Sequence, residues 1–208
     1  MANGPWGSSS SAFNYGYFYN TSLAQYCIRK VGYYFEYTDR TDNIGIVHST
    51  FSAFNAEETL LCRAEAYALQ QKYTLALSDI NSILSKFSVD GLSLSLADIQ
   101  NFYGNINYYT PTIATVKKQF HTSFAIESTT QEPLLQCIMQ LRRLLTLHEG
   151  LRWQDIKRYG MVIYRRQITN GKVTAVTDTL TVNDPRRAIQ LPQNVIAAGM
   201  QENPRNTK

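Results

Sequence analysis

The strongest constraint on the fold lies in residues 54–87, "FNAEETLLCRAEAYALQQKYTLALSDINSILSKF". Apolar residues here recur at the spacing of one helix face, in two runs separated by a short break near Gln71. Small residues among them would let two helix axes approach closely. The pattern predicts an antiparallel helix pair of the tetratricopeptide kind, and one such pair cannot bury its faces alone. The predicted stripes are Leu60, Leu61, Ala64, Tyr67 and Ala68, then Leu75, Ala76, Ile80, Ile83, Leu84 and Phe87.

Other helices are indicated by the residues that begin and end them. Asn55 is expected to cap the first helix of the pair. Ser95 and Asp98 have the spacing of a capping box, and Pro133 is expected to open a long helix that ends near His148. The predicted helices outside the pair cover 95–103, about 113–120, 133–148 and 152–158.

Aromatic residues gather in the N-terminal part of the chain, with four of them at alternate positions: Phe13, Tyr15, Tyr17 and Tyr19. An extended strand would put all four on one face. The burst GYYFEY at 32–37 is also predicted to be extended, and 39–52 to be loop. Farther on, Asn170-Gly171 between two alternating segments is a strong hairpin signal.

The fold class predicted from these signals is mainly α: a tetratricopeptide-like helix pair plus an irregular C-terminal region with a small β-hairpin. Residues 1–53 are expected to form an aromatic-rich extended or loop segment, and 54–208 a helical region, within one compact domain overall.

The composition is that of a globular protein, with 44% hydrophobic and 17% charged residues. A net charge of +4 is too mild to predict nucleic-acid binding. No run of about twenty apolar residues would span a membrane. Cys27, Cys62 and Cys137 are scattered, which fits neither a disulfide framework nor a zinc site, and Cys62 and Cys137 are expected to be buried thiols.

The stretch "HEGLRWQDIKRYG" at 148–160 concentrates charge and leaves several functions open. His148 and Glu149, with Asp155 nearby, would be a general-base pair, but sequence neighbours do not share a helix face. No zinc-binding His-Glu-x-x-His motif occurs, and the three histidines, His48, His121 and His148, do not form a recognisable metal set. We therefore predict no catalytic residue, no metal and no cofactor.

Two further interpretations of this region use its arginines. They would line a surface that binds phosphate or sulfate, or they would pair with interleaved acids and brace two segments of the chain against each other. We favour a structural clasp made of Glu149, Arg152, Trp153, Asp155, Arg158, Asp184, Arg186 and Arg187. The basic residues that the anion-site interpretation would use are Arg142, Arg143, Arg152, Lys157, Arg158, Arg165, Arg166, Arg186 and Arg187.

These motifs together resemble the C-terminal signature of the SusD/RagB family, outer-membrane nutrient-uptake lipoproteins of Bacteroidetes. The family pattern has a corner E-G-x-R-[WF]-x-D-[LI]-x-R, then D-P-R-[RE], then a proline turn, then Q-N-P. The corner is matched by Glu149, Gly150, Arg152, Trp153, Asp155, Ile156 and Arg158, and the later elements by Asp184, Pro185, Arg186, Arg187, Pro192, Asn203 and Pro204. The order and rough spacing of all these elements agree.

The chain also departs from the family pattern. The helix before the corner usually carries E-R and E-L, where this chain has Leu141-Arg142 and Leu144-Leu145, so a brace is expected to be missing or rewired. Family members are much longer, and their N-terminal helices, signal peptide and lipidated cysteine have no counterpart here. The resemblance therefore implies a truncated or short SusD-like chain.

The resemblance implies a non-catalytic protein of the outer membrane and cell surface. Such proteins capture a glycan or other nutrient for a TonB-dependent transporter, and a lipid anchor absent from this chain would be the only link to the membrane. Aromatic rings stack on sugar faces in sites of this kind. The ligand-binding candidates are Trp6, Tyr15, Tyr17, Tyr19, Tyr34, Tyr103, Tyr108 and Tyr109. A tetratricopeptide-like peptide-binding scaffold and an enzyme using Glu149 or Asp155 are the alternatives.

Overall fold

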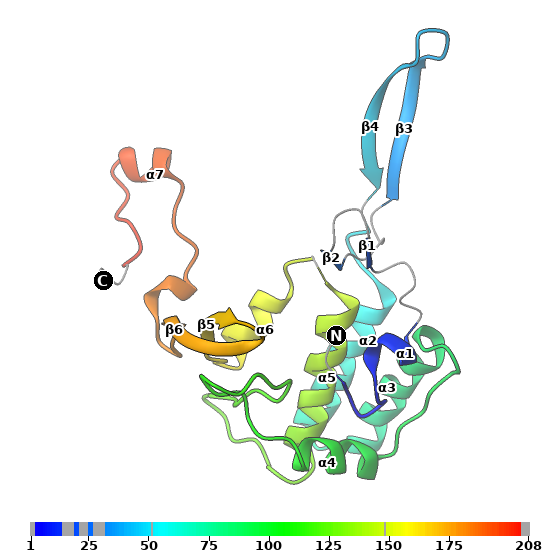
Figure 1. Cartoon of the computed structure of the whole chain (residues 1–208), viewed down its shortest axis with the longest axis vertical. Coiled ribbons are helices and arrows are strands. Elements are labelled where there is room, and N and C mark those ends of the chain that lie inside the picture. The colour runs from blue at the N-terminus through cyan, green and yellow to red at the C-terminus, as the bar shows by residue number, and fades with distance from the viewer. Residues whose placement is uncertain are drawn as a thin grey trace. The chain divides into compact units, whose positions relative to one another are not determined.

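A computed structural model of the chain describes residues 3–13, 19–20, 25–26, 32–50, 52–147 and 149–204 (Figure 1). The described residues form a mainly α structure with small antiparallel hairpins, as predicted. Contacts divide the chain into two compact units, Met1–Tyr103 with Glu127–Gly150, and Gly104–Ile126 with Leu151–Lys208. This division differs from the predicted one at residue 53, and the domain boundaries stay a prediction.

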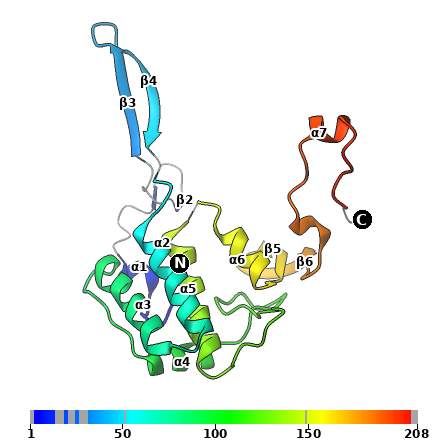
Figure 2. The ribbon, with the colours of Figure 1, turned by 180° about the vertical axis from the view of Figure 1, so that it is seen from behind.

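The first unit is built around three helices, α2 (Ala56–Leu69), α3 (Tyr73–Phe87) and α5 (Gln131–Leu145). The three lie side by side in both views of the ribbon (Figures 1 and 2). Only residues 70–72 connect α2 to α3, so the two helices run in opposite directions, as the sequence predicts. Alanines where the axes meet are fully buried, which permits close packing: Ala64, Ala68 and Ala76. Helix α5 covers the pair and is buried along most of its length.

Some predictions about this helix pair were wrong in detail. Leu75 is 47% and Phe87 38% exposed, although both were placed in the apolar stripe. Leu75 is exposed because, at 100° per residue, it lies roughly 140° around the helix from the buried Ile80. Phe87 is exposed because it is the last residue of α3. Asn55 precedes α2 but its side chain makes no capping hydrogen bond. Of the two thiols predicted to be buried, Cys137 is buried and Cys62 is exposed.

Helix α4 (Leu96–Gly104) begins with the capping box that the sequence predicts. The amide of Asp98 donates to the Ser95 hydroxyl over 3.2 Å, and the amide of Ser95 donates to the Asp98 carboxylate over 2.8 Å. At the other end of α4, the Tyr103 hydroxyl donates to the Gln140 side chain of α5 over 2.6 Å. This bond ties α4 to the core helices.

The N-terminus of α5 is stabilised by a carboxylate that lies before the helix. The Glu127 side chain accepts hydrogen bonds from the amides of Thr129, Thr130 and Gln131. These amides hold the pKa of Glu127 at about 2, against an ordinary value of 4.5, with the amide of Gln131 contributing most. The predicted start of this helix was Pro133, two residues after the observed start at Gln131.

The Glu127 carboxylate should make the stability of the first unit depend on pH. Its pKa is depressed in the folded state, so its contribution is fully present above about pH 4.5 and is lost as pH falls through about 2. Glu127→Gln should therefore lower the melting temperature at pH 7, with a deficit that shrinks toward pH 2.5. Glu58→Gln, which removes the same charge from the first turn of α2, is the control. A deficit that stays constant across this range would contradict the assignment.

Two hairpins lie between the short helix α1 (Ser9–Ala12) and helix α2 of the first unit. One is β1 (Tyr19–Asn20) with β2 (Gln25–Tyr26), and the other is β3 (Gly32–Asp39) with β4 (Ile44–Thr50). The loop predicted over 39–52 is a turn at 40–43, but over Ile44–Thr50 the prediction was wrong, because β-branched residues in β4 favour extended backbone and pairing with β3 satisfies its hydrogen bonds. Of the alternating aromatic residues, those at 15 and 17 lie outside the described residues.

The second unit contains α6 (Arg152–Arg158), β5 (Ile163–Thr169), β6 (Lys172–Leu180), the 3-10 turn η2 (Pro185–Arg187) and α7 (Gln193–Ala197). The hairpin β5–β6 turns at Asn170 and Gly171, both with positive φ, which confirms the prediction. The predicted helix at 113–120 was wrong, since residues 105–130, all described, contain no helix. The loop instead bonds to itself, with the Tyr109 amide donating to the Lys117 carbonyl over 2.8 Å.

Candidate functional site

The corner at 149–161 is shaped by the way α6 ends. The Met161 amide donates to the Ile156 carbonyl over 3.0 Å, and the Gly160 amide donates to the Lys157 carbonyl over 3.3 Å. Gly160 has φ +57°, so the helix ends in a Schellman motif. A Cβ at Gly160 would lie 2.4 Å from the His121 carbonyl oxygen, so this position requires glycine for space as well as for conformation.

Arg187 joins this corner to the segment that follows β6. Its buried guanidinium donates to the carbonyls of Thr181 (2.6 Å), Ile156 (2.9 Å) and Met161 (2.5 Å). Burial lowers the pKa of Arg187 from its ordinary value, and Asp184 opposes that shift. The Ile156 carbonyl belongs to the last turn of α6, where the helix dipole favours a cation.

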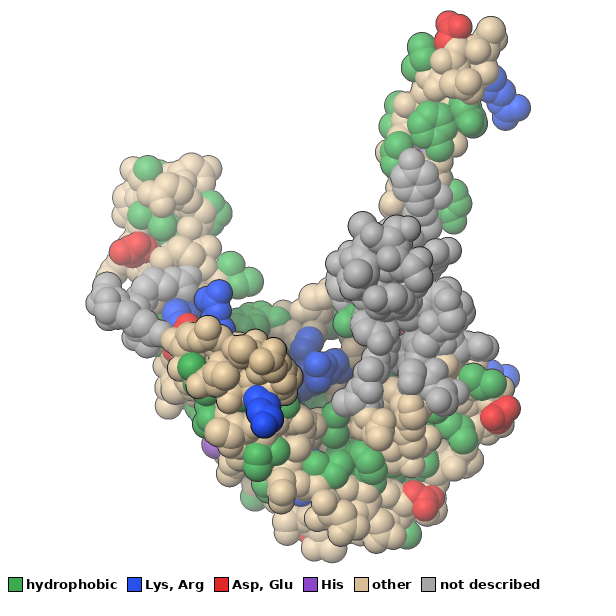
Figure 3. Space-filling model, viewed as in Figure 1, with side chains coloured by type: hydrophobic (Ala, Val, Ile, Leu, Met, Phe, Trp, Pro, Cys, Tyr) green, Lys and Arg blue, Asp and Glu red, His purple; other side chains and the backbone are tan. Residues whose placement is uncertain are grey.

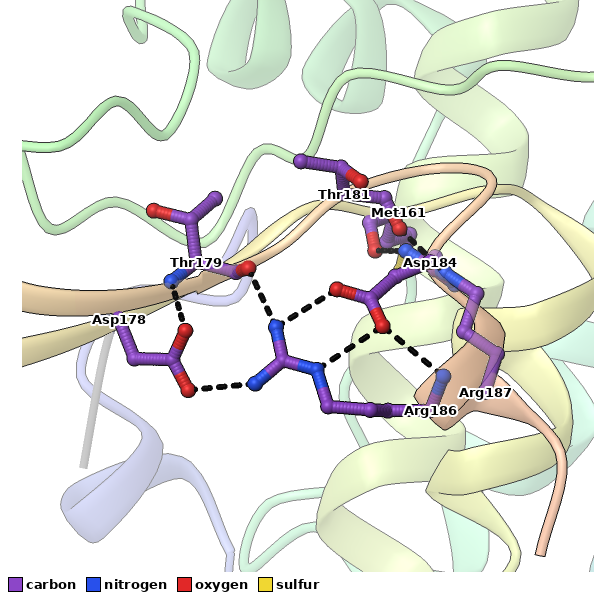
Figure 4. Close-up of polar contacts among 7 residues, drawn as sticks. All are labelled: Met161, Asp178, Thr179, Thr181, Asp184, Arg186 and Arg187. Carbon is purple, nitrogen blue, oxygen red and sulfur yellow. Dashed lines mark hydrogen bonds and ion pairs between the residues drawn. The ribbon is translucent and has the colours of Figure 1, made fainter. Parts of the chain in front are cut away.

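Arg186 turns the other way and forms the ion pairs (Figure 4). It contacts both oxygens of the Asp184 carboxylate, over 2.9 and 2.6 Å, and the Asp178 carboxylate over 2.6 Å. Its remaining contact is with the Thr179 carbonyl over 2.9 Å. The Arg186 side chain holds the pKa of Asp184 below its ordinary value, and the two carboxylates raise the pKa of Arg186.

The geometry corrects the predicted partner of one arginine in the clasp. Arg187 was expected to meet carboxylates, and it binds main-chain carbonyls instead. Arg152 lies 3.5 Å from the buried Asp155 within the same helix. Trp153 and Glu149 are half-buried, and Arg158 is exposed with its guanidinium 6.0 Å from the Tyr159 ring. His148 lies outside the described residues. The role of the whole set as a structural clasp stays a proposal.

Arg142, one of the basic residues of the anion-site interpretation, is buried inside the first unit. Its guanidinium contacts the Glu65 carboxylate of α2 over 2.7 Å. Both side chains are less than a tenth exposed. Arg142 therefore stabilises the packing of α5 on α2 and offers no surface to a free anion.

Two of the predicted ligand-binding rings are part of the core. Trp6 is 8% exposed, donates from its indole nitrogen to the Ser9 hydroxyl over 2.9 Å and meets Phe13 edge to face. Tyr103 is fully buried under α5. Neither ring has an open face for a sugar, because Trp6 packs against Phe13 and Tyr103 is buried beside α5.

The predicted tyrosines near the N-terminus lie on or before the β3–β4 hairpin. Tyr34 is 51% exposed and stacks on His48 at a centroid distance of 5.8 Å. The backbone of Tyr19 lies in β1, while its side chain and all of Tyr15 and Tyr17 lie outside the described residues. Hydrophobic side chains are visible on the surface of this hairpin (Figure 3). Exposed hydrophobic residues of β3 and β4 include Phe35, Tyr37, Ile44, Ile46 and Val47.

The second unit brings aromatic and basic side chains together where the 104–126 loop meets β5. The rings of Tyr109 and Tyr164 stack with centroids 5.4 Å apart. The Lys118 ammonium lies 3.0 Å from the Tyr109 centroid, and the Arg166 guanidinium carbon lies 4.1 Å from it. Nearby, the Lys117 ammonium lies 4.3 Å from the Tyr108 centroid. We call these six residues the Tyr–Lys cluster: Tyr108, Tyr109, Lys117, Lys118, Tyr164 and Arg166.

Arg166 fixes the position of the loop in this cluster. Its guanidinium donates to the main-chain carbonyls of Thr110, Pro111 and Ile113. Of the cluster, Tyr108 and Tyr109 were predicted as ligand-binding residues, and Arg166 was one of the basic residues of the anion-site interpretation. Tyr164 was missed, although it lies two residues before Arg166 on a strand and so shares a face with it, which is the sequence signal that would have found it.

Beside the cluster lies a hollow of about 100 Å³, lined by Tyr109, Lys118, Gln119, His121, Val162 and Tyr164. Ligand sites that enclose a drug-sized molecule measure roughly 300–1,000 Å³, so this hollow would take one substituent or one edge of a sugar ring. His121 is held by the corner, since its Nδ1 lies 3.1 Å from the Gly160 carbonyl and its amide donates to the Tyr159 carbonyl. The lining combines ring surface with side chains that can bond to hydroxyl groups.

Within the part of the chain that the structure describes, no three His, Cys, Asp or Glu side chains come together as metal ligands. Among the helices of the same described residues, none is long and apolar enough to cross a membrane.

The comparisons with known proteins identify the family. The model of the SusD family (SusD_RagB) matches residues 3–204, so the chain belongs to this family of outer-membrane nutrient-uptake proteins that bind glycans. No curated protein and no solved structure matches the chain. The family resemblance drawn from the corner and the later arginine motif is thereby confirmed.

Proposed function

We propose that the chain is a non-catalytic glycan-binding protein of the cell surface that acts with a TonB-dependent outer-membrane transporter. Membership of the SusD family supports binding of a glycan or nutrient in outer-membrane uptake. Three statements go beyond this family membership and are proposals: that the chain is not an enzyme, that a TonB-dependent transporter is its partner, and that a lipid anchor attaches it to the membrane.

The observation that carries this proposal is the stacked pair Tyr109–Tyr164 beside the hollow. The Tyr109 ring is in contact with Tyr164, Lys118 and Arg166, which leaves it as a support rather than a sugar platform. Tyr164 is half-exposed and lines the hollow with Gln119. A ring that meets a sugar face, next to groups that bond to hydroxyls, is the arrangement expected for glycan recognition.

Tyr164→Ala should weaken glycan binding about ten-fold, because loss of a stacked ring costs about 1.4 kcal/mol. Retention in native gels that contain dextran, xylan, inulin, polygalacturonate, alginate or chondroitin sulfate would measure this effect. Phe54→Ala removes a ring that is 92% exposed in the other unit and should leave retention unchanged. Equal retention of Tyr164→Ala and wild type, both with wild-type melting temperatures, would count against the site.

The proposed partnership needs its own measurement. The chain, produced together with a TonB-dependent transporter from the same organism, should co-purify with that transporter from solubilised outer membranes. Retention of a glycan without any co-purification would leave the binding function standing and remove the transporter from the proposal.

The tetratricopeptide-like character of the α2–α3 pair stays part of the proposal. The close approach of the two helices supports it, with Ala64 and Ala76 fully buried. Peptide-binding pairs of this kind offer a groove, whereas here α5 packs against both helices. The proposed ligand site therefore lies in the second unit and not on the helix pair.

A further inference from the structure

The second unit carries a large excess of positive charge. Residues 104–126 and 151–208 contain twelve Lys and Arg but only four Asp and Glu, whereas the rest of the chain contains eight Lys and Arg and twelve Asp and Glu. The modest net charge of +4 therefore hides a unit of +8 and a remainder of −4. A local excess of this size creates a potential that attracts anions.

Most of the acids in this unit already have arginine partners. Asp178 and Asp184 both contact Arg186, and Asp155 contacts Arg152. Residues 104–126, which supply most of the hollow, contain no acid at all. The fourth acid, Glu202, lies far along the chain in the C-terminal tail.

Two basic residues of the Tyr–Lys cluster, Arg166 and Lys118, contact carbonyl oxygens and an aromatic ring. Arg166 donates to main-chain carbonyls and lies over the Tyr109 ring. Lys118 donates to the Thr115 carbonyl over 3.2 Å and lies over the same ring. Carbonyl dipoles and ring faces orient a cation without cancelling its charge, so these contacts preorganise the positive groups for an anionic ligand.

We propose that the hollow beside the Tyr–Lys cluster selects an anionic glycan, one whose sugars carry carboxylate or sulfate groups. The inference rests on the proposed glycan-binding function and names the class of its ligand. Lys118 would meet the acidic group, because it is the lysine among the residues that line the hollow. Gln119 and Tyr164 would bond to the neighbouring sugar.

Pairs of polymers that differ only in charge test this inference. Polygalacturonate and its methyl ester share a backbone, as do chondroitin sulfate and its desulfated form, and the two pairs separate carboxylate from sulfate recognition. The charged member of at least one pair should bind ten-fold more tightly or better, measured by titration calorimetry on the whole chain. This preference should fall as NaCl is raised, because salt screens the attraction.

Two charge-matched variants show whether the preference is local. Lys118→Gln should reduce binding of the charged polymer at least five-fold at an unchanged melting temperature. Lys172→Gln removes one charge of the same unit beside the exposed β5–β6 turn. This variant should change binding of the charged polymer less than two-fold. Equal losses in both variants would show a diffuse effect of net charge and overturn the site.

The remaining outcomes separate this inference from the proposed function. Neutral and charged polymers that bind equally well, with a loss in Tyr164→Ala, would overturn charge selection and leave glycan binding intact. A chain that binds none of the polymers would overturn both.

Discussion

Replacement of Arg187 by alanine is expected to lower the free energy of unfolding by about 3–5 kcal/mol, the cost of removing one partner from a buried polar arrangement. Three main-chain carbonyls, those of Ile156, Met161 and Thr181, lose their guanidinium donor at once. They belong to the last turn of α6, the last residue of its Schellman motif and the residue after β6, so the loss separates segments that local bonds do not join. Urea unfolding at 25 °C measures it.

Two arginine variants serve as comparisons. Arg187→Lys keeps the charge but cannot reach three carbonyls with one ammonium group, so it should recover less than half of the loss. Arg165→Ala removes an exposed arginine of β5 and should change the free energy of unfolding by about 0.5 kcal/mol or less. A loss below 1 kcal/mol in Arg187→Ala would show that water replaces the guanidinium, and the corner would then need no brace.

Where local signals decide the structure, the sequence was sufficient to predict it. The apolar spacing in 54–87 predicts α2 and α3 because a helix face repeats within a few residues. The Ser95–Asp98 capping box and the Asn170-Gly171 turn were predicted for the same reason. Each of these signals involves residues that are near neighbours in the chain.

Where distant segments decide the structure, the sequence was not sufficient. Strand β4 forms because β3 offers it hydrogen-bond partners, and the 104–126 loop is positioned by Arg166 from more than fifty residues away. Trp6 was predicted as a ligand-binding residue, yet it is buried against Phe13. Contacts of this kind leave no periodic trace in the sequence.

The candidate site was predicted in part, and the part that was missed depends on contacts between distant segments. Tyr109 was among the predicted ligand-binding residues, but its partner Tyr164 comes from a strand that was predicted only as part of a hairpin. The charge difference between the two units is present in the sequence, but it becomes visible only after the fold assigns 104–126 and 151–208 to one unit.

A second large effect is expected in the first unit, at the ion pair between Arg142 and Glu65. Arg142→Met should lower the free energy of unfolding by about 3–5 kcal/mol, because it leaves a buried carboxylate without its guanidinium. The two groups are 2.7 Å apart, and their side chains are 8% and 9% exposed. Arg143→Met removes the exposed neighbouring arginine of α5 and should have little effect.

The double variant Glu65→Leu/Arg142→Met decides whether the pair stabilises the fold or only avoids a penalty. Desolvation of two charges offsets most of their attraction, so a well-packed apolar replacement should come within about 1 kcal/mol of wild type. The two single losses should therefore exceed the double loss by several kcal/mol in a double-mutant cycle. Additive losses would mean that the two side chains act independently. In that case the contact between α2 and α5 would depend on apolar packing alone. Glu65 would then not replace the glutamate that the family pattern usually has at position 141, before Arg142.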